Sequence, residues 1–136
     1  MTTTHLATTR TASDSMLRLV LRLDAVASGL TGLAALAGVE FLPDLLGTPV
    51  ALLVPVGIFL LAWAGALGYL ASRPRVAPAA IWTVIVLNLV WVLDSVATVL
   101  TGWFPLTGIG IGYVIAQAVA VAAFADLQYV GLRRIR

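Results

Sequence analysis

The sequence contains no cysteine and a single histidine, His5, in 136 residues. Without thiols the chain has no disulfides, no thiol chemistry and no thiolate metal sites. One histidine near the N-terminus supplies neither a haem ligand nor a histidine metal cluster inside a membrane. Residues 108–112 (GIGIG) follow no predicted strand and begin an apolar helix, so they do not form a dinucleotide loop. We also find no nucleophile–base pair, and therefore expect a protein that is not an enzyme and holds no metal or cofactor.

Charged residues are scarce as well, at 10% of the chain against about 25% in soluble proteins. Apolar residues reach 61% and the mean hydropathy is +1.06, which is more apolar surface than a water-soluble fold can cover. Four hydrophobic stretches of about 20 residues match the roughly 30 Å hydrocarbon core of a bilayer. We predict spans at about 16–39, 49–72, 79–100 and 108–131.

These spans are expected to be helices, because a chain in lipid must satisfy its own backbone hydrogen bonds and four strands are too few to close a barrel. The predicted fold is therefore all-α, with residues 16–136 as one four-helix transmembrane bundle. Residues 1–15, rich in threonine and serine, are predicted to be a flexible cytoplasmic tail. A signal peptide cleaved after Ala37 is an alternative, but Arg22 and Asp24 interrupt its apolar stretch.

Lysine is absent, and the arginines are distributed unevenly. They occur near both termini and in the loop between the second and third spans, whereas the other two loops have none. The positive-inside bias therefore places both termini and the middle loop of this multi-pass protein in the cytoplasm, and the resemblance described below implies a bacterial plasma membrane. The pI near 9.7 then reflects topology and not nucleic-acid binding. The arginines are Arg10, Arg18, Arg22, Arg73, Arg75, Arg133, Arg134 and Arg136.

Two segments of the chain resemble each other. Residues 23–32 (LDAVASGLTG) are identical to residues 93–102 (LDSVATVLTG) at seven of ten positions. A weaker match relates Tyr69 and Arg73 to Tyr129 and Arg133. The pattern predicts two helical hairpins related by a parallel pseudo-repeat, as in some transporter folds. Chance similarity in a chain rich in alanine, valine and leucine is the alternative.

Asp24 and Asp94 lie within predicted spans, where an aspartate costs about 2.5–3.5 kcal/mol to insert. Such a residue is usually turned inward, paired or protonated. Helical spacing places Ser28 and Thr31 on the face of Asp24, and Thr98 on the face of Asp94. The aspartates are thus candidates for a proton or ligand site, although they can equally serve packing by hydrogen-bonding neighbouring helices.

The amides of Asn88 and Gln117 are predicted near mid-membrane, within reach of Asp24 or of a ligand. Because Asp24 and Asp94 differ in depth by about 6–15 Å, we do not expect them to act as a dyad. Arg22 and Asp126 are predicted to form an ion pair near the inner interface. The candidate intramembrane site comprises Asp24, Ser28, Asn88, Asp94, Thr98 and Gln117.

Small residues recur every four positions in the fourth span and predict a close-packing face, within the monomer or in an oligomer. Two tryptophans, Trp63 and Trp91, lie deep in their spans and are expected to pack in the bundle or to line an apolar pocket. The predicted packing face comprises Gly108, Gly112, Ala116 and Ala120.

In helix count the chain is similar to the small multidrug transporters, which also carry one acidic residue in the first helix. It has no glutamate in any predicted helix, however, and its arginine bias is too one-sided for an antiparallel dimer. In helix count and size, over nearly its whole length, it resembles the small DoxX-like membrane proteins found among actinobacteria. That resemblance rests on architecture alone, and implies only a membrane role.

We therefore predict a non-enzymatic accessory or interaction subunit in the lipid bilayer, partnered by further copies of itself or by another membrane protein and not by nucleic acid. The alternative is a small transporter or binder of an apolar or cationic ligand that uses Asp24 and Asp94.

Overall fold

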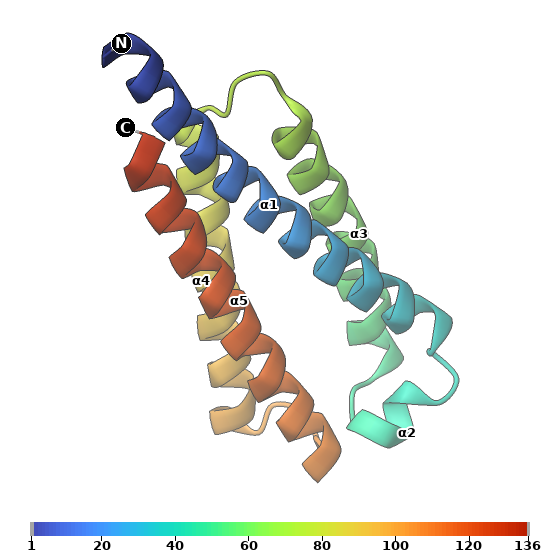
Figure 1. The fold of residues 1–136 in the computed structure, drawn as a ribbon. Helices are drawn as coiled ribbons and strands as arrows, with labels where there is room; N and C mark the ends of the chain where they lie inside the picture. The colour runs from blue at the N-terminus through green and yellow to red at the C-terminus, as the bar shows by residue number, and fades with distance from the viewer. Residues whose placement is uncertain (1, 136) are drawn as a thin grey trace.

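The computed structural model describes residues 2–135, and describes side chains from Asp14 onwards. Four long helices, α1 (Thr2–Ala37), α3 (Val50–Ser72), α4 (Pro78–Thr101) and α5 (Gly108–Ile135), are joined by short connections, one of which contains α2 (Leu42–Leu46) (Figure 1). Each long helix is long and apolar enough to cross a membrane, and residues 2–135 contain no strand. The predicted all-α four-helix bundle is confirmed, and the chain is a multi-pass membrane protein.

The helix boundaries differ from the prediction in two places. Residues 2–15, predicted as a flexible tail, form the first turns of α1, so no change in secondary structure separates them from the span. The first loop contains α2, with Pro43 in its first turn and Gly47 at its end. The Gly47 N–H donates to the Pro43 carbonyl at 2.8 Å. The Gly47 backbone has φ 78°, and this left-handed conformation at the end of a helix favours glycine.

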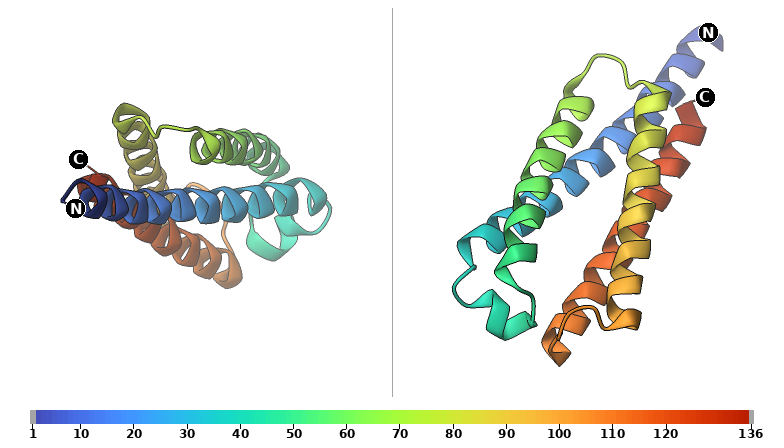
Figure 2. Two further views of the ribbon diagram at one scale, coloured as in Figure 1. Left: turned by 45° about the horizontal axis from the view of Figure 1, so that its top comes forward. Right: turned by 180° about the vertical axis from the view of Figure 1, so that it is seen from behind.

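The helices form two hairpins that meet along one side. In each hairpin neighbouring helices pack together, α1 with α3 and α4 with α5, and the hairpins meet mainly where α1 packs on α5. The order around the bundle is therefore α3, α1, α5, α4. Seen from behind, α3 and α4 stand next to each other with α1 crossing beyond them, and the seam between these two helices is the least packed side of the bundle (Figure 2).

Both termini and the α3–α4 loop lie at one end of the bundle, and α2 and the α4–α5 loop lie at the other (Figure 1). We call the first the arginine end, because it carries Arg18, Arg73, Arg75, Arg133 and Arg134. Glu40 and Asp44 lie at the opposite end. The side of the membrane that each end faces stays a prediction from the positive-inside bias.

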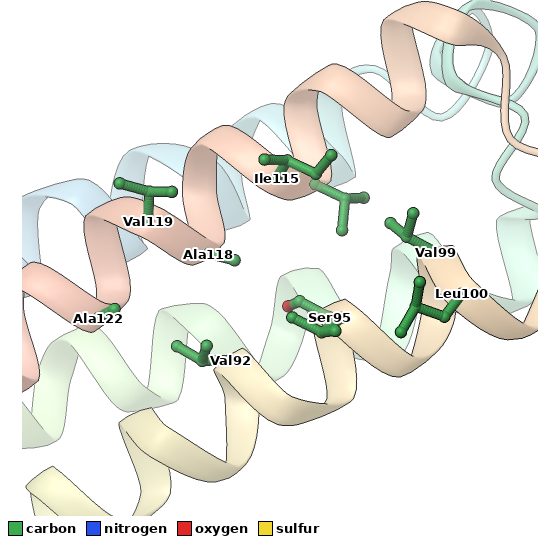
Figure 3. A pocket seen from close by; sticks show the side chains of 10 residues that line it. Val92, Ser95, Val99, Leu100, Ile115, Ala118, Val119 and Ala122 are labelled. Atoms are coloured by element: carbon green, nitrogen blue, oxygen red, sulfur yellow. The ribbon is translucent and has the colours of Figure 1, made fainter.

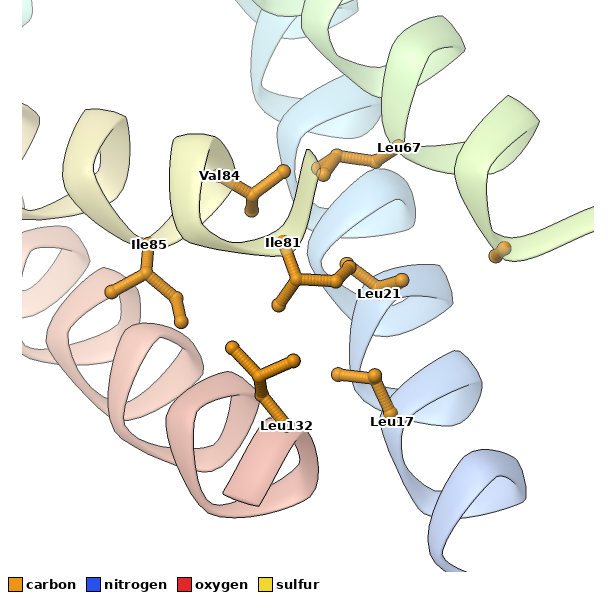
Figure 4. Close-up of a cluster of buried hydrophobic side chains, with 8 residues drawn as sticks. Leu17, Leu21, Leu67, Ile81, Val84, Ile85 and Leu132 are labelled. Atoms are coloured by element: carbon orange, nitrogen blue, oxygen red, sulfur yellow. The ribbon is translucent and has the colours of Figure 1, made fainter. Parts of the chain in front are cut away.

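The apolar core lies near the arginine end, where all four long helices meet (Figure 4). It fixes the two hairpins against each other at this end, whereas α3 and α4 have little direct contact with each other. The core comprises Leu17, Leu21, Leu67, Ala71, Ile81, Val84, Ile85 and Leu132.

Arg18 reinforces this end by joining α1 to the end of α3. Its guanidinium donates to the carbonyls of Ala71 at 2.7 Å, Arg73 at 2.5 Å and Pro74 at 3.1 Å, and forms a salt bridge with Asp14 at 2.7 Å. The last carbonyls of a helix have no partner within the helix, so an arginine from a neighbouring helix satisfies them.

Glycine allows the close crossing of α1 and α3. A Cβ atom on Gly32 would lie 2.8 Å from the carbonyl oxygen of Gly57 and 3.1 Å from the Cβ of Leu60. Only a residue without a side chain lets the two backbones approach this closely in lipid, where association depends on packing.

The predicted packing face of α5 does not pack within the monomer. Gly108, Gly112, Ala116 and Ala120 are exposed, and a Cβ on either glycine would meet no atom within 4 Å. The helix instead turns a different face inward, because that face carries the large buried side chains of Gln128 and Leu132. The close approaches on this face are made by Gly110 against Leu46 and by Gly131 against Leu17.

Gly32→Ala should destabilise the protein, because the new methyl group forces α1 and α3 apart. Overpacking of this kind costs about 1–3 kcal/mol, which exceeds the gain of up to about 1 kcal/mol from replacing glycine in a helix. Gly65→Ala on α3 is the matched control, since its methyl group meets no atom within 4 Å. Thermal unfolding in detergent should show a lower Tm for Gly32→Ala and an equal or higher Tm for Gly65→Ala. Equal Tm values for the two variants would contradict the close crossing.

Candidate functional site

The carboxylate of Asp24 on α1 is buried and accepts hydrogen bonds from three side chains. Its Oδ2 accepts from Asn88 Nδ2 on α4 at 3.0 Å and from Gln128 Nε2 on α5 at 2.9 Å, and its Oδ1 accepts from Ser28 Oγ at 3.2 Å. Asn88 Nδ2 also donates to Gln128 Oε1 at 3.0 Å. We call these four residues the Asp24 network, and it joins α1, α4 and α5.

Three members of the network are almost completely buried. Exposure is 1% for Asp24, 4% for Asn88 and 0% for Gln128. Among the described side chains, the one buried nitrogen or oxygen without a partner is Thr48 Oγ1, which lies outside the network. The network therefore links three helices through hydrogen bonds, and a packing role for Asp24 stays a prediction.

No cationic side chain among the described residues pairs with Asp24. Within residues 14–135 the one salt bridge joins Arg18 to Asp14, so the groups that contact the Asp24 carboxylate are neutral donors. An ionised carboxylate only accepts hydrogen bonds, and all three neighbours donate to it. The hydrogen bonds to Asp24 thus all come from neutral groups, and none of them is part of an ion pair.

A second polar cluster lies along α4 on the side away from the arginine end. Trp91 Nε1 donates to Gln117 Oε1 at 2.7 Å, and Gln117 Nε2 donates to Ser95 Oγ at 2.9 Å. Ser95 Oγ in turn donates to the Trp91 carbonyl at 2.8 Å. We call Trp91, Ser95 and Gln117 the Trp91 cluster; it joins α4 to α5.

The glutamine beside Asp24 is not the one that the sequence predicted. Gln128 contacts Asp24, whereas Gln117 contacts Trp91 and Ser95. Gln128 is not among the site residues predicted from the sequence, although the sequence contains a signal for it. The two glutamines are eleven residues apart, about three helical turns, and so share one face of α5.

The remaining predicted site residues lie outside the Asp24 network. The Asp94 side chain is exposed and its carboxylate accepts no hydrogen bond from a described residue, because the Thr98 hydroxyl donates instead to the Asp94 backbone carbonyl at 2.7 Å. The Thr31 hydroxyl likewise donates to a backbone carbonyl, that of Ala27. Such bonds to the preceding turn are the usual choice of threonine in an apolar helix.

The predicted ion pair of Arg22 and Asp126 is not formed between these described side chains. Both are exposed, since the face of α1 that meets α5 carries Leu21 and Asp24 and turns Arg22 outward.

A cleft of about 300 Å³ lies between α3 and α4, where the bundle is least packed. Asp24, Ser28 and Asn88 contribute to its lining, and Asp94 lies on the same cleft. The two aspartates are therefore at one cleft without being hydrogen-bonded to each other. No group of three or more histidine, aspartate or glutamate side chains that could hold a metal ion gathers among the described residues.

Aromatic rings form a wall of the cleft. Phe59 of α3 stacks on Trp63, one turn along the same helix, with ring centroids 6.1 Å apart and planes at 15°. It also stacks across the seam on Trp91 of α4, at 6.1 Å and 8°. All three rings line the cleft together with Asp24 and Asp94. The combination of aromatic faces and carboxylates is the one that binds organic cations.

A groove of about 290 Å³ lies on the other side of α4, between α4 and α5, and is apolar (Figure 3). Valine, leucine, isoleucine and alanine side chains line it, and Ser95 is its one polar residue. The hydroxyl of Ser95 is already hydrogen-bonded within the Trp91 cluster. The groove carries no group for ionic or acid–base chemistry, so the candidate functional site is the cleft.

Gln128→Leu should destabilise the bundle, because it removes a donor from Asp24 and an acceptor from Asn88 while keeping the volume of the side chain. Leaving buried polar groups without partners costs about 1–3 kcal/mol. Asp126→Asn, an exposed neighbour on α5 without an ion pair, is the control and should unfold like the wild type. Chemical or thermal unfolding in detergent measures both variants. A Gln128→Leu variant as stable as Asp126→Asn would show that the network contributes nothing to stability.

No protein-family model, no curated protein and no solved structure matches the chain. The resemblance to the DoxX-like proteins stays a prediction from architecture, and function has to be argued from the site itself.

Proposed function

We propose that this membrane protein binds an organic cation in the cleft between α3 and α4, with the carboxylate of Asp24 as its anchor, as a small transporter or ligand-binding protein would. One observation supports this proposal above all others. Asp24 is a buried carboxylate without a cationic partner among the described residues, and it lies on a cleft that three aromatic rings line.

The network prepares Asp24 for this role. Three donors hold the carboxylate in one orientation, so a ligand does not have to order it on binding. The donors are neutral, so a cationic ligand would be the first opposite charge beside Asp24, and attraction between a carboxylate and a cation is stronger in a low-dielectric interior than in water. A structural role of the network and a binding role of its carboxylate therefore support each other.

Entry from the bilayer fits the exposed side chains around the cleft. Phe59 on α3 and Val90 on α4 line the cleft and are about half exposed on the outer surface of the bundle. A cation with a large apolar body can remain in the hydrocarbon region while its charge approaches the carboxylate. The ligand class that this geometry favours is thus an apolar monocation and not a water-soluble metabolite.

The direct test compares two probes of the same shape and opposite charge, tetraphenylphosphonium and tetraphenylborate. Wild-type protein in nanodiscs should bind the cation and exclude the anion, because the charge at the site is negative. Asp24→Asn should weaken binding of the cation about tenfold or more, equivalent to about 1.4 kcal/mol. Asp44→Asn, an exposed carboxylate at the opposite end of the bundle, should bind the cation like the wild type. Isothermal titration calorimetry measures these affinities.

Two further measurements complete this test. If Asp24→Asn fails to accumulate, Asp94→Asn replaces it, since Asp94 lies on the cleft and outside the network; it should weaken binding of the cation while leaving Tm unchanged. Equal binding of both probes, or a folded Asp24→Asn variant with wild-type affinity, would rule out the proposed function. Flux of the cation into proteoliposomes then distinguishes a transporter from a binding protein.

A second candidate function, an accessory or interaction subunit, is supported by the outward face of α5. Its small residues are exposed and meet no neighbouring helix, which is the arrangement that lets a further transmembrane helix approach. The face comprises Gly108, Gly112, Ala116 and Ala120.

The absence of native cysteine makes this second function testable with single-cysteine variants. In native membranes Gly112→Cys should give a cross-linked species, with the mass of a dimer or of a complex with another protein. Gly65→Cys, at an exposed glycine of α3, should remain monomeric. Mass spectrometry of the cross-linked band identifies the partner. A Gly112→Cys variant that remains monomeric would count against an interface on α5.

A further inference from the structure

We infer that Gln117 is a positioning residue that holds the Trp91 indole in the wall of the cleft and thereby makes the cleft prefer aromatic over aliphatic cations. The inference rests on the proposed function, because it concerns selectivity among the cations that bind there. Gln117 does not line the cleft, so any effect on the ligand has to pass through Trp91.

The Trp91 indole is held by an amide that is itself fixed. Gln117 Oε1 accepts from Trp91 Nε1 at 2.7 Å, while Gln117 Nε2 donates to Ser95 Oγ at 2.9 Å and to the Val114 carbonyl at 2.8 Å. The indole N–H of this partly buried tryptophan needs an acceptor, and Gln117 provides it. Without this acceptor, the Trp91 ring must either leave its N–H unsatisfied or turn toward another partner.

The orientation of Trp91 determines what the cleft offers to a ligand. Its plane lies 8° from that of Phe59, which lies 15° from that of Trp63, so three rings are nearly parallel. Any cation gains from the electrostatic attraction of an aromatic face, and tryptophan provides the strongest. An aromatic cation also gains from ring–ring packing, which depends on the orientation of the rings. Turning Trp91 should therefore weaken binding of aromatic cations more than that of aliphatic ones.

The experiment measures a ratio of affinities for two probes of equal charge, tetraphenylphosphonium and tetrabutylphosphonium. Gln117→Leu in nanodiscs should lower the preference for the aromatic probe roughly two- to tenfold relative to the wild type, the range expected from the energies of aromatic pairs. Tyr113→Leu, an exposed aromatic residue one turn away on α5, is the matched control and should keep the wild-type ratio.

A double-mutant cycle tests whether Gln117 acts through Trp91. Trp91→Phe keeps an aromatic ring but removes the indole N–H, so adding Gln117→Leu to it should change the ratio no further. An additional loss in the double variant, or equal weakening of both probes by Gln117→Leu alone, would overturn the inference and leave Gln117 as a packing residue.

A ligand-free readout separates this inference from the proposed function. The indole ¹⁵N–¹H resonance of Trp91, assigned by its disappearance in Trp91→Phe, should shift and exchange faster with solvent in Gln117→Leu. An unchanged resonance would overturn the inference even if cations bind, whereas wild-type protein that binds neither probe would overturn the proposed function. Ser95→Ala removes one anchor of Gln117, should lower the ratio by a smaller factor, and replaces Gln117→Leu if that variant does not accumulate.

Discussion

The buried carboxylate of Asp24 is the group on which the arrangement of the helices depends. Lipid offers it no hydrogen bonds, so the protein must supply every partner. Those partners are Ser28 of α1, Asn88 of α4 and Gln128 of α5. The hydrogen bonds that they donate to the carboxylate hold these three helices together. The remaining long helix, α3, has no residue in the network. It packs on α1 through the glycine crossing at Gly57. The polar interaction thus leaves one side of the bundle, between α3 and α4, weakly packed.

The two ends of the bundle keep that weakly packed side in place. At the arginine end, the apolar core and the contacts of Arg18 with the end of α3 fix both hairpins. At the opposite end, the Thr107 N–H donates to the Leu46 carbonyl at 3.0 Å, and Gly110 allows α2 to lie against α5. The cleft therefore lies between two fixed ends of the bundle. Its polar lining belongs to the Asp24 network, which joins α1, α4 and α5. Under the proposed function such a site would be preorganised, since a ligand could enter without movement of the two ends.

The two similar segments of the chain end up in different surroundings. Tyr69 and Arg73 form a cation–π pair at 5.4 Å, and Tyr129 and Arg133 form the corresponding pair at 5.7 Å. Each pair joins residues four apart in the chain, at the end of α3 and within α5, so similar local sequences produce similar pairs. Asp24 and Asp94 differ, because α1 lies between α3 and α5 whereas α4 packs mainly on α5. The relation between the two halves remains a prediction, and their local similarity does not extend to equivalent tertiary contacts.

The sequence by itself determined that four apolar helices span a membrane, since length and hydropathy decide this locally. It also identified Asp24, Ser28 and Asn88 as members of one polar site, because carboxylates and amides in lipid must find each other. It did not reveal that Gln128 instead of Gln117 completes the network, that the small face of α5 lies outward, or that Asp94 and three aromatic rings share a cleft. Those features depend on how each helix is rotated and which helices are neighbours. Only the tertiary structure decides this, because the rotation of each helix depends on the hydrogen bonds and the side-chain packing of all four long helices at once.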